Sequence, residues 1–158
     1  MKKTILVITI FILNLIANDC QIVQENGDYS MVSFLKSSCK NKKINCECFK
    51  LNLESLDKYC LNGDSKSCTS LSSLYLDDEE KAFEYSKKAC EIGVKNKEYQ
   101  AHGCQNVGLI YINRFHNKNN MTDKIEAVYY FRKACDLRNA KDDPSMSVAC
   151  HYHKELSK

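Results

Sequence analysis

Ten cysteines are the residues of this chain with the greatest capacity for chemistry. A thiolate can act as a nucleophile or bind zinc, and two thiols can pair as a disulfide in an oxidising compartment. Zinc sites use reduced, closely spaced cysteines, and the only tight pair here is Cys46-Glu47-Cys48. The compartment that receives the protein therefore decides what the cysteines do.

The amino terminus predicts export. A basic stretch, residues 1–3, precedes an apolar run over residues 4–16. This run has the length of a signal-peptide core and is short for a membrane span, so a retained membrane anchor is the weaker alternative. Cleavage after Ala17 would leave residues 18–158 as a single disulfide-rich domain, secreted or periplasmic. A lipoprotein fits badly because Asp19 precedes Cys20. Export predicts a disulfide framework with no metal and no cofactor.

Enzyme chemistry is not visible in the remaining polar residues. Serine beta-lactamases need a Ser-x-x-Lys motif together with Ser-x-Asn and Lys-Thr-Gly elements. Three Ser-x-x-Lys matches begin at Ser33, Ser37 and Ser55, about the two that Ser and Lys abundance predicts by chance, and the other two elements are missing. The four histidines show no His-x-x-x-His spacing: His102, His116, His151 and His153.

The composition favours helices and excludes one class of partner. Tryptophan is absent, there is a single proline, and Leu, Lys, Glu and Ala dominate several windows. Acidic and basic residues are interspersed, and loss of the signal would leave a nearly neutral chain without a basic stripe for phosphates. We therefore predict an all-α fold, no binding of nucleic acid, no membrane span after cleavage, and a monomer.

An internal repeat divides the chain. Residues 81–90 match residues 126–135 at Ala, Tyr, Lys, Ala and Cys. A second set recurs at identical offsets, with Cys68, Leu71, Ser72 and Tyr75 matching Cys104, Val107, Gly108 and Tyr111. The small residue of this set would let two helix backbones cross closely, and the tyrosines at helical spacing belong to the core. Each unit is thus a helical hairpin.

Helix-start residues set the boundaries of the units. Asp64 and Asp78 predict the starts of the two helices of the first repeat, over residues 64–92. Asn96 predicts the start of the second repeat, over residues 96–137. Within this repeat, Thr122 or Asp123 caps the second helix, and a long loop over residues 113–121 connects the two helices. Asp143 starts a terminal helix over residues 143–157, and residues 19–60 hold two divergent helices, 27–38 and 45–59.

The repeat makes local pairing of the cysteines the economical choice. Three bridges would join the second helix of one unit to the first helix of the next: Cys60 with Cys68, Cys90 with Cys104, and Cys135 with Cys150. Cys39 with Cys48 and Cys20 with Cys46 complete the set, and Cys46 and Cys48 can exchange partners. By the loop-entropy estimate each short bridge stabilises the fold by roughly 2.5–3 kcal/mol.

The pattern of Ala-Cys, a link, Gly-Cys or Ser-Cys, and Lys-Ala-x-x-Tyr-x-x-Lys-Ala-Cys resembles the disulfide-bearing Sel1-like repeats, relatives of the tetratricopeptide repeat, over residues 51–150. It is similar to the Helicobacter cysteine-rich protein family of exported bacterial proteins. The resemblance implies a short right-handed α/α solenoid and a scaffold that mediates protein or peptide interaction in the cell envelope. The alternative it implies is penicillin binding with weak beta-lactamase activity.

In such solenoids the first helices of the hairpins line a concave face. Neutral hydrogen-bonding residues occupy the non-core positions there: Thr69, Ser73, Gln105, Asn106 and Asn113. Amides and hydroxyls at these positions could bind an extended peptide backbone. The alternative for each residue taken singly is a solvated helix face.

Overall fold

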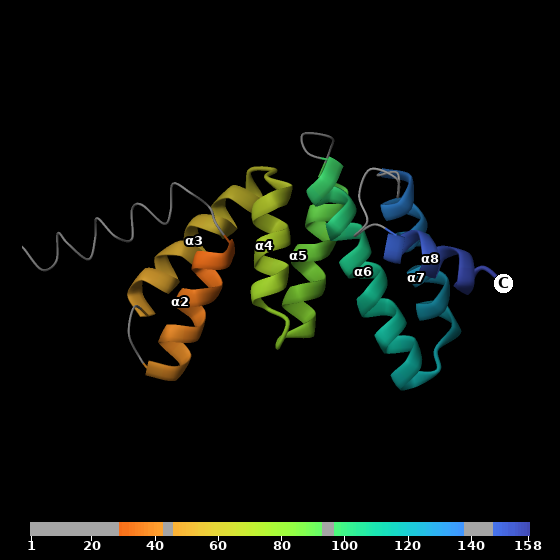
Figure 1. Ribbon diagram of the computed structural model, residues 1–158, viewed down its shortest axis with the longest axis horizontal. Coiled ribbons are helices and arrows are strands. Elements are labelled where there is room, and N and C mark those ends of the chain that lie inside the picture. The colour runs from red at the N-terminus through yellow and green to blue at the C-terminus, as the bar shows by residue number, and fades with distance from the viewer. Residues whose placement is uncertain (1–28, 43–45, 93–96, 138–146) are drawn as a thin grey trace, which may run out of the picture. The chain divides into compact units, whose positions relative to one another are not determined.

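The computed structural model describes residues 29–42, 46–92, 97–137 and 147–158, and in these ranges the chain is all-helical, as the sequence predicts (Figure 1). The described helices are α2 (Tyr29–Lys42), α3 (Cys46–Leu61), α4 (Ser65–Leu74), α5 (Glu79–Glu91), α6 (Lys97–Lys118), α7 (Met121–Leu137) and α8 (Ser147–Leu156). The predicted signal peptide, Cys20, and the predicted caps Asn96 and Asp143 lie outside the described residues. Within the described ranges, none of the helices combines the length and apolar character that crossing a membrane requires.

The chain divides into two compact units, residues 1–58 and 59–158. In the first unit, Leu35 of α2 packs with Cys48 and Phe49 of α3, and the three side chains form a small apolar cluster. The buried amide of Asn52 donates to the Cys48 carbonyl at 2.8 Å, which satisfies this polar group within its own helix.

In the second unit, each helix packs against the next one along the chain, and α4 also contacts α6 (Figure 1). The core of the carboxyl-terminal helices is fully buried at Val107, Phe131 and Ala134. Two glycines of α6 allow close helix approaches. A Cβ atom on Gly103 would lie 2.6 Å from that of Ala89, and one on Gly108 would lie 2.9 Å from the Phe131 ring.

The same pair of stacked tyrosines recurs in the two hairpins of the second unit. Tyr75 and Tyr85 have ring centroids 5.7 Å apart at an interplanar angle of 12°. Tyr111 and Tyr130 have centroids 5.8 Å apart at 20°. These are the tyrosines that the sequence repeat aligns, so equivalent residues make equivalent contacts. Tyr130 is buried, and the other three rings are half-buried.

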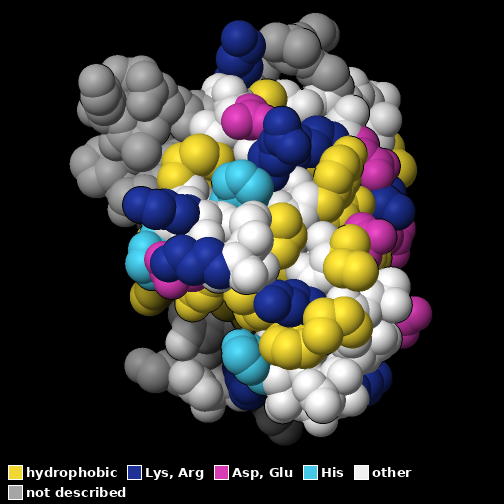
Figure 2. All heavy atoms as spheres, turned by 90° about the vertical axis from the view of Figure 1, so that its right-hand side faces the viewer, with side chains coloured by type: hydrophobic (Ala, Val, Ile, Leu, Met, Phe, Trp, Pro, Cys, Tyr) yellow, Lys and Arg dark blue, Asp and Glu magenta, His cyan; other side chains and the backbone are white. Residues whose placement is uncertain are grey.

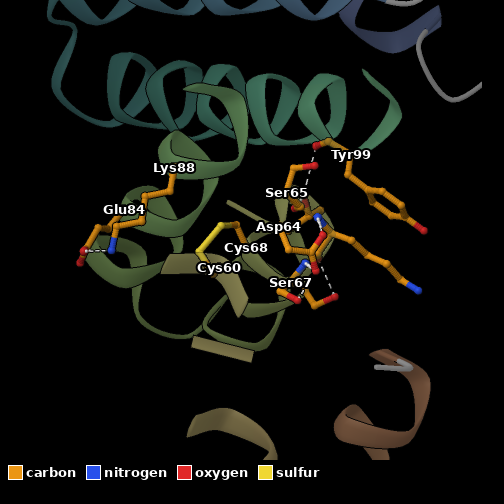
Figure 3. Close-up of a disulfide and its surroundings, with 11 residues drawn as sticks. Cys60, Asp64, Ser65, Ser67, Cys68, Glu84, Lys88 and Tyr99 are labelled. Atoms are coloured by element: carbon orange, nitrogen blue, oxygen red, sulfur yellow. Dashed lines mark hydrogen bonds and ion pairs between the residues drawn. A yellow bond between two sulfur atoms is a disulfide. The ribbon is translucent and has the colours of Figure 1, made fainter. Parts of the chain in front are cut away.

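The helix starts agree with the sequence at two caps and differ at a third. Asp64 accepts from the backbone N–H groups of Lys66 and Ser67 (Figure 3). Asp78 accepts from that of Lys81. The prediction of Thr122 or Asp123 as the cap of α7 is wrong, because Asn120 Oδ1 accepts from the Thr122 N–H at 3.0 Å. The long loop predicted at residues 113–121 is also wrong.

Helix α6 continues to Lys118, and only Asn119 and Asn120 separate it from α7. Asn119 has φ of 50°, in the left-handed region that asparagine tolerates, and its N–H donates to the Phe115 carbonyl at 2.7 Å. A helix can thus end and reverse over two residues, which shortens the loop.

Four disulfides are described, and three are the pairs predicted between successive hairpins: Cys60–Cys68 (Figure 3), Cys90–Cys104 and Cys135–Cys150. The fourth joins Cys39 to Cys46, so the predicted Cys39–Cys48 pair is wrong, and Cys39 has the partner of the exchanged alternative. Residues 46 and 48 lie about 200° apart around a helix, so only one of them can meet Cys39. Cys48 is disulfide-bonded as well, and its predicted exchange partner, Cys20, lies outside the described residues.

Candidate binding pocket

A pocket of about 220 Å³ lies in the second unit, where the turn between α4 and α5 meets the carboxyl-terminal half of α6. Residues from three helices and one turn line it: Ser72, Leu76, Glu79, Ala82, Asn106, Leu109, Ile110 and Asn113. Because α4 contacts both α5 and α6, the position of this pocket is set by helix packing inside one compact unit.

Small residues of the first hairpin leave room for the pocket. Ser72 and Ala82 are 1% and 3% exposed. The Ser72 hydroxyl lies 2.5 Å from that of Ser86, so the two buried hydroxyls share a hydrogen bond inside the hairpin. Larger side chains at either position would fill the space. The pocket is therefore a hollow produced by short side chains between helices that are fixed elsewhere.

The walls are apolar. Leu109 and Ile110 of α6 are half-buried, and Leu76 in the turn after α4 is 76% exposed, the highest exposed fraction among the large hydrophobic residues described. A leucine so exposed leaves apolar surface in water, and a ligand side chain that covered it would gain from burial. The walls thus suit an aliphatic or aromatic group.

The polar rim combines two amides with one carboxylate. Asn106 is half-buried and Asn113 is exposed, and both lie on α6. Glu79 Oε1 accepts from Arg114 Nε at 2.7 Å. The Arg114 guanidinium lies 4.8 Å from the Phe83 ring centroid and 5.7 Å from that of Tyr111. The two aromatic rings and the ion pair with Glu79 thus hold Arg114 in place. This arrangement fixes Glu79 at the amino terminus of α5.

Two of the five predicted binding residues, Asn106 and Asn113, line this pocket. The other three do not. The Thr69 hydroxyl donates to the carbonyls of Ser65 and Tyr99, the second of which is on α6, and the Ser73 hydroxyl donates to the Thr69 carbonyl. Gln105 Oε1 is a buried acceptor that lacks a hydrogen-bond partner among the described residues.

Leu76 and Glu79 line the pocket but are not among the binding residues predicted from the sequence. The available signal was an apolar residue in a turn directly before a run of acidic residues, Asp-Asp-Glu-Glu at positions 77–80. Turns are usually polar, so the leucine marks a surface that differs from an ordinary connection.

The stacked pair of Tyr111 and Tyr130 is a structural feature of the core. Burial raises the pKa of Tyr130 to about 12, and the neighbouring Tyr111 and Glu91 add to this effect. Burial and then Glu126 raise the pKa of Tyr111, while Arg114 opposes them. A raised pKa keeps each phenol neutral, so neither ring supplies a charged group for catalysis near neutral pH.

The remaining candidates for chemistry do not line the pocket. Ser33 and Ser37 are on α2 and Ser55 is on α3, all in the first unit, and none of the three lines the pocket. Over the described residues, His, Cys, Asp and Glu form no group of three that could hold a metal ion.

The surface of α7 carries a second, different feature. Met121, Ile125 and Tyr129 are each more than half exposed and lie one helical turn apart. A hollow of about 450 Å³ lies farther along the same helix and is lined by Tyr129, Arg132, Lys133, Asp136 and Leu137. Figure 2 views the side of the molecule where α7 and α8 lie, and hydrophobic and basic side chains alternate there.

Comparisons of the sequence with protein-family models and with curated proteins, and of the fold with solved structures, give no match. The function therefore has to follow from the chemistry of the chain's own residues.

Proposed function

We propose that the protein is an exported scaffold of the Sel1-like repeat type, a short α/α solenoid whose second unit binds an extended segment of a partner protein or peptide. The secreted or periplasmic location is supported by the cysteines, since none of those described is free and disulfides persist in oxidising compartments. The repeat type is supported by the recurring tyrosine stack and by the three bridges between successive hairpins.

One observation carries the binding role: Asn106 and Asn113 border the same apolar pocket on the same helix. They are seven residues apart, which is about two helical turns or roughly 10.5 Å along the axis. An extended chain advances about 3.3 Å per residue, so three residues span this distance. A side-chain amide both donates and accepts hydrogen bonds, and it therefore matches the N–H and C=O groups of a peptide backbone.

The apolar walls add affinity that the amides alone would not give. Hydrogen bonds to a ligand replace hydrogen bonds to water, so their net contribution is about 0.5–1.5 kcal/mol each. Burying a leucine-sized side chain contributes about 1.5–3 kcal/mol. The amides would thus set the direction and register of the segment, and the pocket would supply most of the binding free energy.

The test is a peptide selection on the purified, oxidised protein, followed by calorimetry of the selected peptide with variants. We expect Asn106→Ala and Asn113→Ala to weaken binding about three- to tenfold each, which corresponds to the loss of one hydrogen bond. Leu76→Ser should weaken it by a similar or larger factor. Asn62→Ala, an exposed amide that does not line the pocket, serves as the matched control. Equal affinity of all four variants would refute the choice of site.

A further inference from the structure

The rim of the pocket is acidic on the side of α5. Glu79 lines the pocket, and residues 77–80 are all acidic. Two ion pairs involve this segment: Lys81 Nζ lies 3.7 Å from Asp78 Oδ2, and Arg114 Nε lies 2.7 Å from Glu79 Oε1. No lysine or arginine lines the pocket itself.

The ion pair with Arg114 does not remove Glu79 as a binding group. The hydrogen bond from Arg114 uses Oε1, and a carboxylate has a second oxygen with its own lone pairs. Arg114 is fixed against the rings of Phe83 and Tyr111 and does not line the pocket, whereas Glu79 does. A cation that approached the pocket would therefore meet a carboxylate before it met the guanidinium.

The volume of the pocket suits one side chain. Its 220 Å³ exceeds the ~150 Å³ cavity that holds a benzene molecule in a protein core, so a leucine, isoleucine or phenylalanine side chain can enter. It is smaller than the roughly 300–1,000 Å³ of pockets that hold a whole small-molecule ligand. The rest of a bound segment would lie on the surface, within reach of the rim.

We propose that the pocket selects peptide segments in which an aliphatic residue and a lysine or arginine are two positions apart. The inference rests on the proposed function and names the partner's chemistry. Side chains two positions apart on an extended segment point to the same side, roughly 7 Å from each other. The aliphatic group occupies the space between Leu76 and Leu109, and the cation pairs with Glu79. The amides of Asn106 and Asn113 contact the backbone of the same segment.

Four capped pentapeptides with the centres Leu-Ser-Lys, Leu-Ser-Gln, Leu-Ser-Glu and Ala-Ser-Lys provide the probes. Each is titrated into isotopically labelled, oxidised full-length protein at low ionic strength, and the shifts of the Asn106 and Asn113 side-chain amide signals give the dissociation constants. We expect the Lys peptide to bind about three- to fivefold more tightly than the Gln peptide, the range of an exposed ion pair, and to lose this preference in concentrated salt. The Ala peptide should bind about tenfold more weakly.

Two variants test whether Glu79 causes the preference for the Lys peptide over the Gln peptide. Glu79→Gln should abolish the discrimination between the Lys and Gln peptides, so that their dissociation constants become equal. Glu84→Gln is the matched control, since Glu84 is also on α5 and is also paired, with Lys88 at 2.8 Å, but does not line the pocket. Equal discrimination in the two variants would overturn the role of Glu79.

The outcomes separate this inference from the proposal beneath it. Equal binding of the Lys, Gln and Glu peptides, or tighter binding of the Glu peptide, would overturn the basic–aliphatic preference and leave peptide binding standing. Absence of any shift at Asn106 and Asn113 with all four peptides would overturn both. A preference for Lys that disappears in Glu79→Gln and persists in Glu84→Gln would support both.

Discussion

Gly103 lies where α6 crosses α5, and a methyl group added there tests how far the close packing of these helices contributes to stability. A Cβ atom at this position would lie 2.6 Å from Ala89 Cβ, 2.7 Å from Cys90 N and 2.9 Å from Ala89 C. An ordinary contact requires at least 3.4 Å, so the helices would have to separate by about 0.8 Å. The Cys90–Cys104 bond, with its Cα atoms 4.6 Å apart, joins the neighbouring residues and opposes that movement.

Two effects of opposite sign compete in Gly103→Ala. Alanine in place of glycine inside a helix stabilises the fold by about 0.8–1.0 kcal/mol. Overpacking a filled contact costs about 1–3 kcal/mol. Two of the three clashing atoms belong to the backbone and cannot rotate away, so the upper half of that range applies. The net loss should be about 1–2 kcal/mol, or on the order of 5–15 °C in melting temperature for a unit of this size.

The assay is thermal and denaturant unfolding of the oxidised protein, followed by circular dichroism. Asn117→Ala, at an exposed position of the same helix, reports the gain in helix propensity without a new contact. Gly108→Ala gives an intermediate case, because the three heavy atoms nearest its Cβ all belong to the Phe131 ring, at 2.9–3.1 Å. If Gly103→Ala were as stable as the unmodified protein, or more stable, the close crossing of α5 and α6 would be refuted.

Three further predictions follow from buried groups of the second unit. The pKa of Tyr130 is raised to about 12 from its ordinary value of 10, so the stability that its neutral form contributes is complete below pH 10 and is lost as the pH rises toward 12. The unfolding midpoint should therefore fall less steeply between pH 10 and 12 in Tyr130→Phe than in the unmodified protein. Alanine at Ser72 or at Ser86 should lower the free energy of unfolding by about 1–3 kcal/mol, because the other buried hydroxyl loses its partner. In denaturant unfolding, the double variant should lose less than the sum of the two single losses. The Cys135–Cys150 bond, whose residues are half-buried, should be reduced before the fully buried Cys90–Cys104 bond in a timed alkylation and peptide-mapping experiment; the reverse order would contradict the burial described.

Much of the fold could be predicted from local signals. Asp64 and Asp78 start their helices because a carboxylate at this position accepts the first unpaired backbone N–H groups, and that effect requires no knowledge of the rest of the chain. The three bridges between hairpins were accessible because a repeat gives each cysteine the same nearest neighbour. The predictions that were wrong depend on the rotation of a helix about its axis or on a single backbone angle. Whether Cys46 or Cys48 meets Cys39 depends on where α3 begins, and Asn119 ends α6 through one positive φ.

The sequence predicted the amides of the pocket on α6 but not the residues that come from the preceding hairpin. Asn106 and Asn113 could be chosen because the first helix of a hairpin was expected to present its polar positions on one face. Leu76 and Glu79 come from the turn between the helices of the preceding hairpin, and nothing in the sequence tells how far that turn reaches toward α6. The distance of Leu76 and Glu79 from α6 depends on the packing of α4 against α6, which is a contact between the two hairpins.

The small residues at the helix crossing differ between the two hairpins, and this explains why the first hairpin leaves space for the pocket. The sequence repeat aligns Ser72 with Gly108 and Ser86 with Phe131. In the first hairpin, two small hydroxyls meet at 2.5 Å, and in the second, the phenylalanine ring occupies the space that the glycine leaves. A large residue in place of Ser86 would need a glycine at position 72, as in the second hairpin. With serine at both positions the first hairpin fills its crossing with little volume, and Ser72 remains available to line the pocket.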